Sequence, residues 1–500
     1  MTVPAGRARL GLLFIAGIAS SLGFAPWNLW PLTLIGIGWL IRETAAAASR
    51  RQAARAGWAF GFGHFLLGTH WIAQAFQYQQ DMPAWTGWIG VVLLSAYLAV
   101  FPAVAALAAR RIAPAGLALV LGFAGCWTLA EALRGVLFSG FPWNPLGAVA
   151  LPMAGLGQGA ALVGALGLSA VIVLASGALY ALGERQWRTG GAILGLTAAA
   201  ALAGLMPLRT PTGLTTTRLN IVQADIGQDE KWSEDGVERA VAKYLDLSPA
   251  PTASPRVLIW PEAAIPDLLD EMPSMRRRLG AHLGPGDLML LGALKAIRED
   301  DGTAIAAHNS LFALDTEGGI LARYDKKRLV PFGEFLPART LLNAIGLDRL
   351  APGALDFWPG PGPRTLPLPG GVPAVGPLIC YEVIFDGRVT EAGYRPAWLL
   401  NVSNDAWFAG AGAEMHLAQA RLRSIEEGLP MARSTPTGIS AVIDANGRVT
   451  AAMPRGQAGV IDARLPEANP PTLFSHAGRI LPLLLAALLA LLGWSLARRR

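Results

Sequence analysis

Long apolar segments alternate with short polar loops over the first 210 residues and return at the end of the chain. They lie at 10–25, 28–41, 57–78, 84–109, 114–137, 157–183, 190–207 and 480–497. A helix of about 20 apolar residues crosses the hydrocarbon core of a bilayer, so the pattern predicts a multi-pass α-helical membrane protein with eight spans. The second segment is short, which also fits a tilted or interfacial helix.

A different pattern occupies residues 211–478. Apolar runs predict strands at 218–223, 257–260, 288–292, 310–314, 375–379 and 398–402, and helical stretches lie near 234–246, 272–283 and 414–427. Strands interleaved with helices favour a layered sheet with helices outside. We therefore predict a membrane domain of about seven helices (1–210), an inserted α/β domain (211–478), and a last membrane helix with a basic tail (479–500).

Composition agrees with a membrane protein. Hydrophobic residues make up 53% of the chain and charged residues only 15%, whereas a soluble globular protein has about 25% charged residues. A disordered chain, a fibrous chain and an ordinary cytosolic enzyme are therefore excluded. The net charge of +6 divides into +8 over residues 1–210, −6 over 211–478 and +4 over 479–500. The basic excess lies beside the apolar segments, so it indicates membrane topology and no nucleic-acid partner.

Among the short loops between the first seven apolar segments, 26–27, 79–83 and 138–156 contain no Lys or Arg, and the others are basic. The basic positions are Arg7, Arg9, Arg42, Arg50, Arg51, Arg55, Arg110, Arg111, Arg185, Arg188, Arg498, Arg499 and Arg500. By the positive-inside rule, both termini are then cytoplasmic and residues 211–478 face outward. The first segment also resembles a signal peptide. A retained span is favoured, because the second segment follows after a very short turn.

Three chemically useful side chains follow strand-like runs in the polar domain. They are Glu262 in Trp260-Pro261-Glu262, Lys326 in Tyr324-Asp325-Lys326-Lys327, and Cys380 in Ile379-Cys380-Tyr381-Glu382. Strand ends commonly supply functional sites. A carboxylate that takes the thiol proton, an ammonium that stabilises an oxyanion, and a thiol nucleophile together suffice for acyl transfer. The cysteines show no metal-binding spacing, so no metal and no cofactor are predicted.

Each of these residues also has an ordinary structural explanation. A Glu after Pro is usually a solvated turn residue, a Lys in a basic run is usually surface charge, and a lone Cys after a strand is usually packed in a core. Glu334 and Glu382 are equally explained as surface acids or salt-bridge partners. The joint occurrence of all three types after strands is what favours a site.

The motifs resemble those of a known family. The Glu, Lys and Cys segments are similar to the triad of the nitrilase superfamily, and nearly the whole chain resembles the apolipoprotein N-acyltransferase family. The more specific strings are Trp260-Pro261-Glu262-Ala263-Ala264-Ile265-Pro266, Leu329-Val330-Pro331-Phe332-Gly333-Glu334, Cys380-Tyr381-Glu382 and Ser403-Asn404-Asp405-Ala406-Trp407-Phe408. One departure is the basic pair after Lys326, which leaves Lys327 open as an alternative to Lys326.

The resemblance implies a membrane enzyme with an external nitrilase-like α-β-β-α sandwich. It implies that Cys380 takes an acyl chain from the sn-1 position of a phospholipid, such as phosphatidylethanolamine. The chain then passes to the α-amino group of a diacylglyceryl-cysteine at the N-terminus of an apolipoprotein. Glu262 is then the base and Lys326 the oxyanion stabiliser. Supporting residues are Glu334, Tyr381 and Glu382, and substrate-binding residues are Trp232, Trp407 and Phe408.

Two alternatives share the same residues. A membrane-tethered amidase or nitrilase-type hydrolase uses the same triad with water as the second nucleophile, but one span suffices for a tether. A transporter with an accessory domain is disfavoured because Glu131 and Arg134 are the only charges inside the spans, where charge is costly. These two either form an i,i+3 pair that holds the helices together or bring Arg134 to a phospholipid phosphate. The apolar residues of 335–358 fit either a packed helix or a lid over the site.

Overall fold

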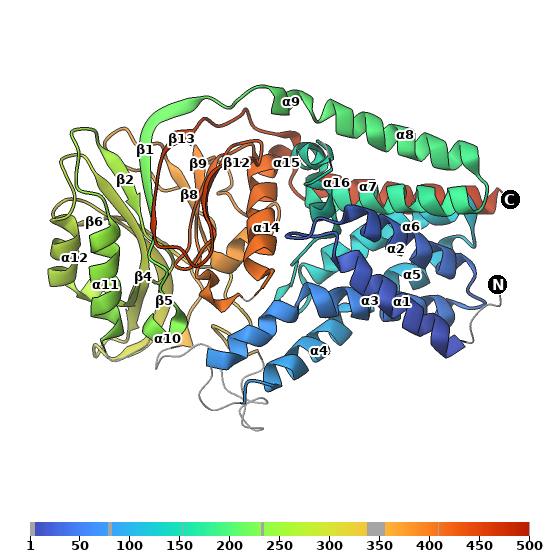
Figure 1. The fold of residues 1–500 in the computed structure, drawn as a ribbon, viewed down its shortest axis with the longest axis horizontal. Helices are drawn as coiled ribbons and strands as arrows, with labels where there is room; N and C mark the ends of the chain where they lie inside the picture. The colour runs from blue at the N-terminus through green and yellow to red at the C-terminus, as the bar shows by residue number, and fades with distance from the viewer. Residues whose placement is uncertain are drawn as a thin grey trace. The chain divides into compact units, whose positions relative to one another are not determined.

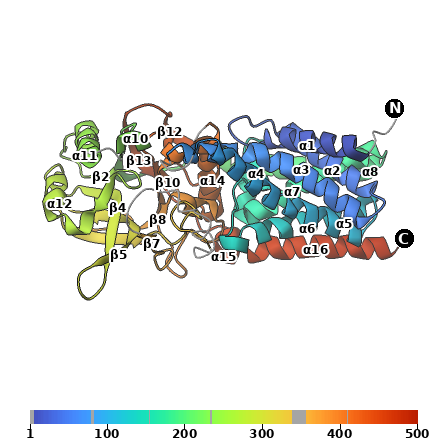
Figure 2. The same cartoon turned by 90° about the horizontal axis from the view of Figure 1, so that it is seen from below.

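The computed structural model describes residues 6–78, 83–153, 155–231, 235–337, 356–408 and 410–499. The chain divides into two compact units, which Figures 1 and 2 show as a helical part and a mixed part. The membrane unit comprises residues 1–73, 85–211 and 471–500, and the catalytic unit comprises residues 74–84 and 212–470. The mixed unit thus contains a short segment that comes from between two membrane helices.

The membrane unit is built of helices. They are α1 (Gly6–Ser21), α2 (Trp30–Ala45), α3 (Arg50–Gly68), α4 (Thr86–Leu98), α5 (Val100–Ile112), α6 (Gly116–Arg134), α7 (Ala160–Gly183), α8 (Trp187–Ala203), α9 (Met206–Arg209), α15 (Leu473–Ala477) and α16 (Ile480–Arg498). Short 3-10 helices are η1 (His70–Tyr78), η2 (Leu137–Ser139), η3 (Leu146–Ala150) and η4 (Leu156–Gly159).

Five helical stretches within the described residues are long and apolar enough to cross a membrane. They are Thr86–Ile112, Gly116–Arg134, Leu156–Gly183, Trp187–Arg209 and Ile480–Arg498. Helices α1 and α2 have only 16 residues each, and α3 has lower hydropathy because it begins at a basic, polar turn. The count of eight spans therefore stays a prediction, although a helix lies within each predicted segment.

Small residues allow the membrane helices to pack closely, as expected where van der Waals contact drives association. A Cβ atom added at Gly17 would lie 2.0 Å from the Phe60 carbonyl oxygen, and one at Gly63 would lie 2.1 Å from that of Phe14. Helices α1 and α3 therefore need glycine at both positions. Helix α16 packs along α6 although residues 135–479 separate them in sequence (Figure 2).

The catalytic unit contains two sheets. The first has eight strands in the order β13 (Gly459–Pro466), β1 (Leu214–Gln223), β2 (Arg256–Ile259), β4 (Leu288–Arg298), β5 (Ala304–Leu314) and β6 (Ile320–Asp325), with β3 (Ile265–Leu268) beside β4 and β7 (Asp356–Phe357) beside β5. The second has the order β12 (Val449–Met453), β11 (Ser440–Ile443), β10 (Met431–Ser434), β9 (Trp398–Val402) and β8 (Val375–Ile379).

Helices cover the outer faces of the two sheets (Figure 1). Helices α11 (Gly236–Leu247) and α12 (Pro273–Gly280) share a buried core with the first sheet, in which Tyr244 stacks on Trp260. Helix α14 (Gly412–Glu427) lies on the second sheet, and α10 (Gln228–Lys231), η5 (Leu269–Glu271), η6 (Cys380–Ile384) and η7 (Asp405–Trp407) are short. The predicted layered α/β arrangement is confirmed, with helices outside two facing sheets.

The strand directions place the predicted side chains. Strands β1, β2 and β4 run parallel to one another, as do β8, β9 and β10. Parallel neighbours bring their carboxyl ends to one edge, which is where open α/β sheets commonly hold ligands. Glu262 follows β2, and Cys380 follows β8. The two sheets thus each contribute part of the candidate site.

Candidate active site

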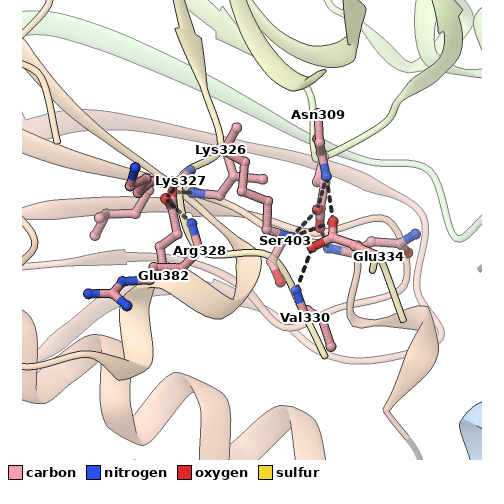
Figure 3. Close-up of polar contacts among 12 residues, drawn as sticks. Asn309, Lys326, Lys327, Arg328, Val330, Glu334, Glu382 and Ser403 are labelled. Carbon is pink, nitrogen blue, oxygen red and sulfur yellow. Dashed lines mark hydrogen bonds and ion pairs between the residues drawn. The ribbon is translucent and has the colours of Figure 1, made fainter. Parts of the chain in front are cut away.

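Glu262, Lys326 and Glu334 form a buried cluster around Asn309. Figure 3 shows Lys326 and Glu334 of this cluster beside Asn309. The Lys326 Nζ lies 2.8 Å from Glu334 Oε1 and 3.2 Å from Glu262 Oε1. Asn309, on β5, donates from Nδ2 to Glu262 Oε1 at 2.7 Å and to Glu334 Oε1 at 3.1 Å. One amide and one ammonium therefore hold the two carboxylates together in spite of their like charge.

Backbone contacts fix the positions of both carboxylates. The Asn404 N–H donates to Glu262 Oε2 at 2.7 Å, and the Val330 N–H donates to Glu334 Oε2 at 2.8 Å. The turn that carries Glu262 also presses against β4, because a Cβ atom at Gly292 would lie 2.6 Å from the Glu262 Cα. Glycine at 292 is required for this close approach.

Lys326 and Lys327 have different surroundings. Lys326 is 1% exposed, and its backbone is held at both ends by Asn309 O at 2.9 Å and by the Gly360 N–H at 2.8 Å. The Lys327 side chain is exposed. Because only Lys326 reaches the carboxylates, it is the better candidate of the two for a site residue.

Cys380 lies in a strained turn at the end of β8. Its φ is +50°, a region that residues with a Cβ rarely adopt and that costs about 1–3 kcal/mol. The side chain is 7% exposed. Such strain is often stored at functional sites.

Glu382 ties the Cys380 turn to the Lys326 segment (Figure 3). Its Oε2 accepts from the Ile379 N–H at 2.8 Å. Its Oε1 accepts from the Tyr324 hydroxyl at 2.7 Å, and from the N–H groups of Lys327 at 2.8 Å and Arg328 at 3.2 Å. Four donors thus converge on one carboxylate, which links the end of β8 to the segment that follows β6.

A second buried network lies behind Cys380. The Ser403 hydroxyl donates to Asp405 Oδ1 at 2.5 Å and also hydrogen-bonds with the Cys380 side chain. Arg433, which is 0% exposed, forms an ion pair with Asp405. His416 Nδ1 lies 3.3 Å from Asp405 Oδ1 and 3.1 Å from Arg433 Nη2, and His416 hydrogen-bonds with the Cys380 backbone. This network contacts both the side chain and the backbone of Cys380, and it therefore supports the turn.

The electrostatics define the resting protonation states. Burial lowers the pKa of Lys326, but Glu262 and Glu334 outweigh it and raise the pKa above the ordinary lysine value. Burial and the Glu262 charge raise the pKa of Cys380, although Lys326 and the Ser403 hydrogen bond oppose them. Lys326 is therefore an ammonium and Cys380 a thiol at rest, so the thiol needs a base when it attacks.

Comparisons with known proteins identify the family of the chain. Residues 16–178 match the apolipoprotein N-acyltransferase N-terminal domain, and residues 218–469 match the carbon-nitrogen hydrolase family. The chain is 37% identical to the apolipoprotein N-acyltransferase of Rhodopseudomonas palustris, over 97% of this chain and 95% of that protein. The chain belongs to the apolipoprotein N-acyltransferase family. It is therefore an acyltransferase of the membrane, as the motifs predicted.

Further relatives cover the same length. Apolipoprotein N-acyltransferases of Bradyrhizobium diazoefficiens and Caulobacter vibrioides are 37% and 38% identical, over 99% and 94% of this chain and 96% and 91% of theirs. Among solved structures, an amidase from Nesterenkonia sp. is 17% identical, with a TM-score of 0.34, over 51% of this chain and 92% of that one.

The structure describes two of the three aromatic residues that are expected to bind substrate, Trp407 and Phe408. Trp407 makes an edge-to-face contact with Tyr78, and Phe408 is buried edge-to-face against His416. Tyr381 is also buried and packs on Phe385. Trp232 and most of the expected lid, residues 338–355, lie outside the described residues. The substrate contacts of these side chains stay predictions.

Glu131 and Arg134 form the i,i+3 ion pair, with Arg134 Nη2 3.1 Å from Glu131 Oε1. Arg134 Nη1 also donates to the carbonyls of Phe141 at 3.1 Å and Trp143 at 2.7 Å. These three contacts, together with the Leu146 N–H that donates to Glu131 Oε1 at 2.7 Å, tie the pair to its own helix and to the segment that follows it. The structure favours the packing explanation for this pair over the lipid-binding one.

Asn309, His416 and Arg433 were not predicted from the sequence of this N-acyltransferase. Asn309 had a visible signal, because His308-Asn309-Ser310 is a polar interruption within an apolar strand. His416 and Arg433 had none, since each lies in an ordinary helical or strand pattern. Among the described residues, no group of three or more His, Cys, Asp or Glu side chains is arranged to hold a metal ion.

Proposed function

We propose that the enzyme transfers an acyl chain from the sn-1 ester of a phospholipid, such as phosphatidylethanolamine, to the α-amino group of a diacylglyceryl-cysteine at an apolipoprotein N-terminus. The observation that carries this proposal is the buried Glu262–Lys326–Glu334 cluster beside a cysteine held in a strained turn. The enzyme spans the bacterial inner membrane eight times, with both termini cytoplasmic and the catalytic domain, 211–478, in the periplasm.

In the first half-reaction, Glu262 takes the Cys380 proton while Sγ attacks the ester carbonyl carbon. Lys326 and the Tyr381 N–H stabilise the oxyanion that forms. The carbon–oxygen bond then breaks, Glu262 returns the proton to the departing oxygen, and a lysophospholipid leaves. The product on the enzyme is a Cys380 thioester. Because Cys380 is a thiol at rest, a base within reach is essential to this step.

In the second half-reaction, the α-amine attacks the thioester carbon and gives its proton to Glu262. The carbon–sulfur bond breaks, the thiolate leaves and regains a proton, and the amide product departs. Glu334 orients Lys326, and Glu382 holds the two segments in register. Trp232, Trp407 and Phe408 bind the substrates. Both substrates are lipids, so a membrane location raises their effective concentration at the site.

Intact-mass spectrometry of the full-length protein tests this function. After incubation with phosphatidylethanolamine, wild type should gain the mass of one acyl chain, removable by hydroxylamine, and Cys380→Ala should gain none. A diacylated lipopeptide should then discharge the adduct to its amine. Discharge to water alone would indicate the hydrolase alternative, and absence of both adduct and lysophospholipid would refute acyl transfer.

A further inference from the structure

Asn404 lies between the two groups that carry out the proposed reaction. It follows β9, the parallel neighbour of the strand β8 that ends at the Cys380 turn. Its N–H donates to Glu262 Oε2 at 2.7 Å, and the preceding residue, Ser403, hydrogen-bonds with the Cys380 side chain. Within the catalytic unit, Asn404 is therefore in contact with the base and next to the nucleophile.

The side-chain oxygen of Asn404 is a buried acceptor without a donor. The residue is 7% exposed, and no hydrogen bond joins its Oδ1 to any residue that the structure describes. Buried amide oxygens are usually hydrogen-bonded, and leaving one without a donor is costly. The main-chain N–H of the same residue is already engaged with Glu262. The side-chain oxygen thus fits a site for an N–H or O–H group that arrives with a substrate.

The Oε2 atom of Glu262 is the oxygen that is able to take a proton. Each carboxylate oxygen has two lone pairs. Those of Oε1 are occupied by Asn309 Nδ2 at 2.7 Å and by Lys326 Nζ at 3.2 Å. From the described residues, Oε2 accepts only the Asn404 N–H. Covalent bonds keep Asn404 Oδ1 within about 5 Å of its own nitrogen, so a group that hydrogen-bonds with Oε2 is within reach of Oδ1 as well.

The acceptor amine carries a group that such an oxygen binds. A neutral α-amine has two N–H bonds when its nitrogen attacks the thioester carbon. One proton passes to Glu262 and then to the Cys380 sulfur as the carbon–sulfur bond breaks, and the other stays as the N–H of the amide product. In a buried site this second N–H needs an acceptor. The acyl donor has no N–H at its reacting ester, so the first half-reaction has no such requirement.

We propose that Asn404 Oδ1 accepts the N–H that the attacking α-amine keeps, and so orients the amine to give its other proton to Glu262. The inference rests on the proposed function, because it assigns the acceptor subsite of the same reaction. Asn404 is then a catalytic residue of the second half-reaction, and only its main-chain N–H serves the first.

The test measures the two half-reactions separately, with the full-length enzyme in detergent at about pH 8, where roughly half of an α-amine is neutral. The first quantity is the rate constant of Cys380 acylation by phosphatidylethanolamine without an acceptor. The second is the rate constant at which a diacylated lipopeptide discharges the isolated acyl-enzyme, followed by intact mass. The variants are Asn404→Leu, which keeps the approximate shape, and Asn404→Ala, which cannot overpack the site. Both keep the main-chain N–H that holds Glu262.

We expect both variants to lower the discharge rate constant about 10- to 100-fold, the loss of one hydrogen bond in a buried site. Their acylation rate constants should match wild type. With both substrates present, the variants should therefore accumulate acyl-enzyme that wild type turns over. Asn469→Leu is the matched control, because the Asn469 amide donates to Asn446 Oδ1 at 2.9 Å, and it should match wild type in both rate constants.

Three results separate the alternatives. An equal loss in both half-reactions would overturn the proposal, because Asn404 would then act by holding Glu262. Discharge at the wild-type rate in the variants would overturn it too, and Asn404→Ala decides alone if Asn404→Leu does not fold. A wild type that forms no acyl-enzyme, or whose acyl-enzyme the amine does not discharge, would refute the proposed function itself, which is a different result from normal wild-type discharge with an unaffected variant.

Discussion

Glu382→Gln is the substitution that most directly tests how the nucleophile is held. The carboxylate accepts four hydrogen bonds, one at Oε2 from Ile379 and three at Oε1. Glutamine has a single oxygen. In its best orientation it keeps the three donors at Oε1 as neutral hydrogen bonds and turns its NH₂ toward the Ile379 N–H.

The expected cost follows from these contacts. An unsatisfied buried N–H costs about 1–3 kcal/mol, and each of three bonds loses about 1 kcal/mol when its acceptor is neutral. Burial raises the pKa of Glu382, because the charged carboxylate is costly in this environment. Removing the charge therefore offsets part of the lost stability. We expect a net loss of about 3–4 kcal/mol, which lowers the unfolding temperature by about 10 °C in a unit of this size.

The rate of Cys380 acylation is the decisive measurement. A displacement of about 1 Å at a reacting group costs roughly 100-fold in rate, so Glu382→Gln should lower acylation by about that factor. Glu391→Gln is the control, because Glu391 accepts a backbone N–H from Thr365 at 2.7 Å, away from Cys380. It should cost about 1 kcal/mol and leave the rate as in wild type. A lowered unfolding temperature with full acylation would refute the positioning role of Glu382.

Three other substitutions test separate parts of the structure. Asn309→Asp replaces the shared amide donor by a third carboxylate and should lower acyl-enzyme formation by about 100-fold or more, measured by intact mass. Asp405→Asn leaves the Arg433 guanidinium buried without a carboxylate and should destabilise the protein by about 3–5 kcal/mol, seen in thermal unfolding. Burial raises the pKa of Glu427 to about 7 from 4.5, so the folded state holds a proton that the unfolded state releases, and stability falls as pH rises from 4.5 to 7. Glu427→Gln should abolish that pH dependence; an unchanged slope would show that other groups cause it.

The strands that flank the site could be predicted from the sequence because they are apolar on both faces. Strands β8 and β9 are buried along their whole length, so their runs are continuous. Strand β12 was missed because it is partly exposed, and its polar and apolar residues give no clear period. The membrane helices could also be predicted because their apolar runs are continuous. Their ends could not, since a helix ends at a turn whose position hydropathy does not indicate.

The side chains of the site could be predicted only in part. Glu262, Lys326 and Cys380 follow strands, and the sequence shows that much. It does not show that Lys326 points into the cluster while Lys327 points away, since that depends on the hydrogen bonds between Lys326 and the backbone at Asn309 and Gly360. Contacts between residues from different strands, such as Asn309 with Glu334, require the fold itself.

The segment 74–84 has a consequence for the order of synthesis. It lies between two membrane helices in the sequence but belongs to the catalytic unit, where the Tyr78 hydroxyl donates to the Ala406 carbonyl at 3.4 Å and its ring contacts Trp407. The ribosome makes this segment well before strand β1, at about 5–20 residues per second. Residues 212–470 translated alone would lack it, and the chain after Asp405 would lose a neighbour. The catalytic unit therefore includes a segment that is synthesised before the rest of the unit. Residues 212–470 expressed alone would not contain the whole unit.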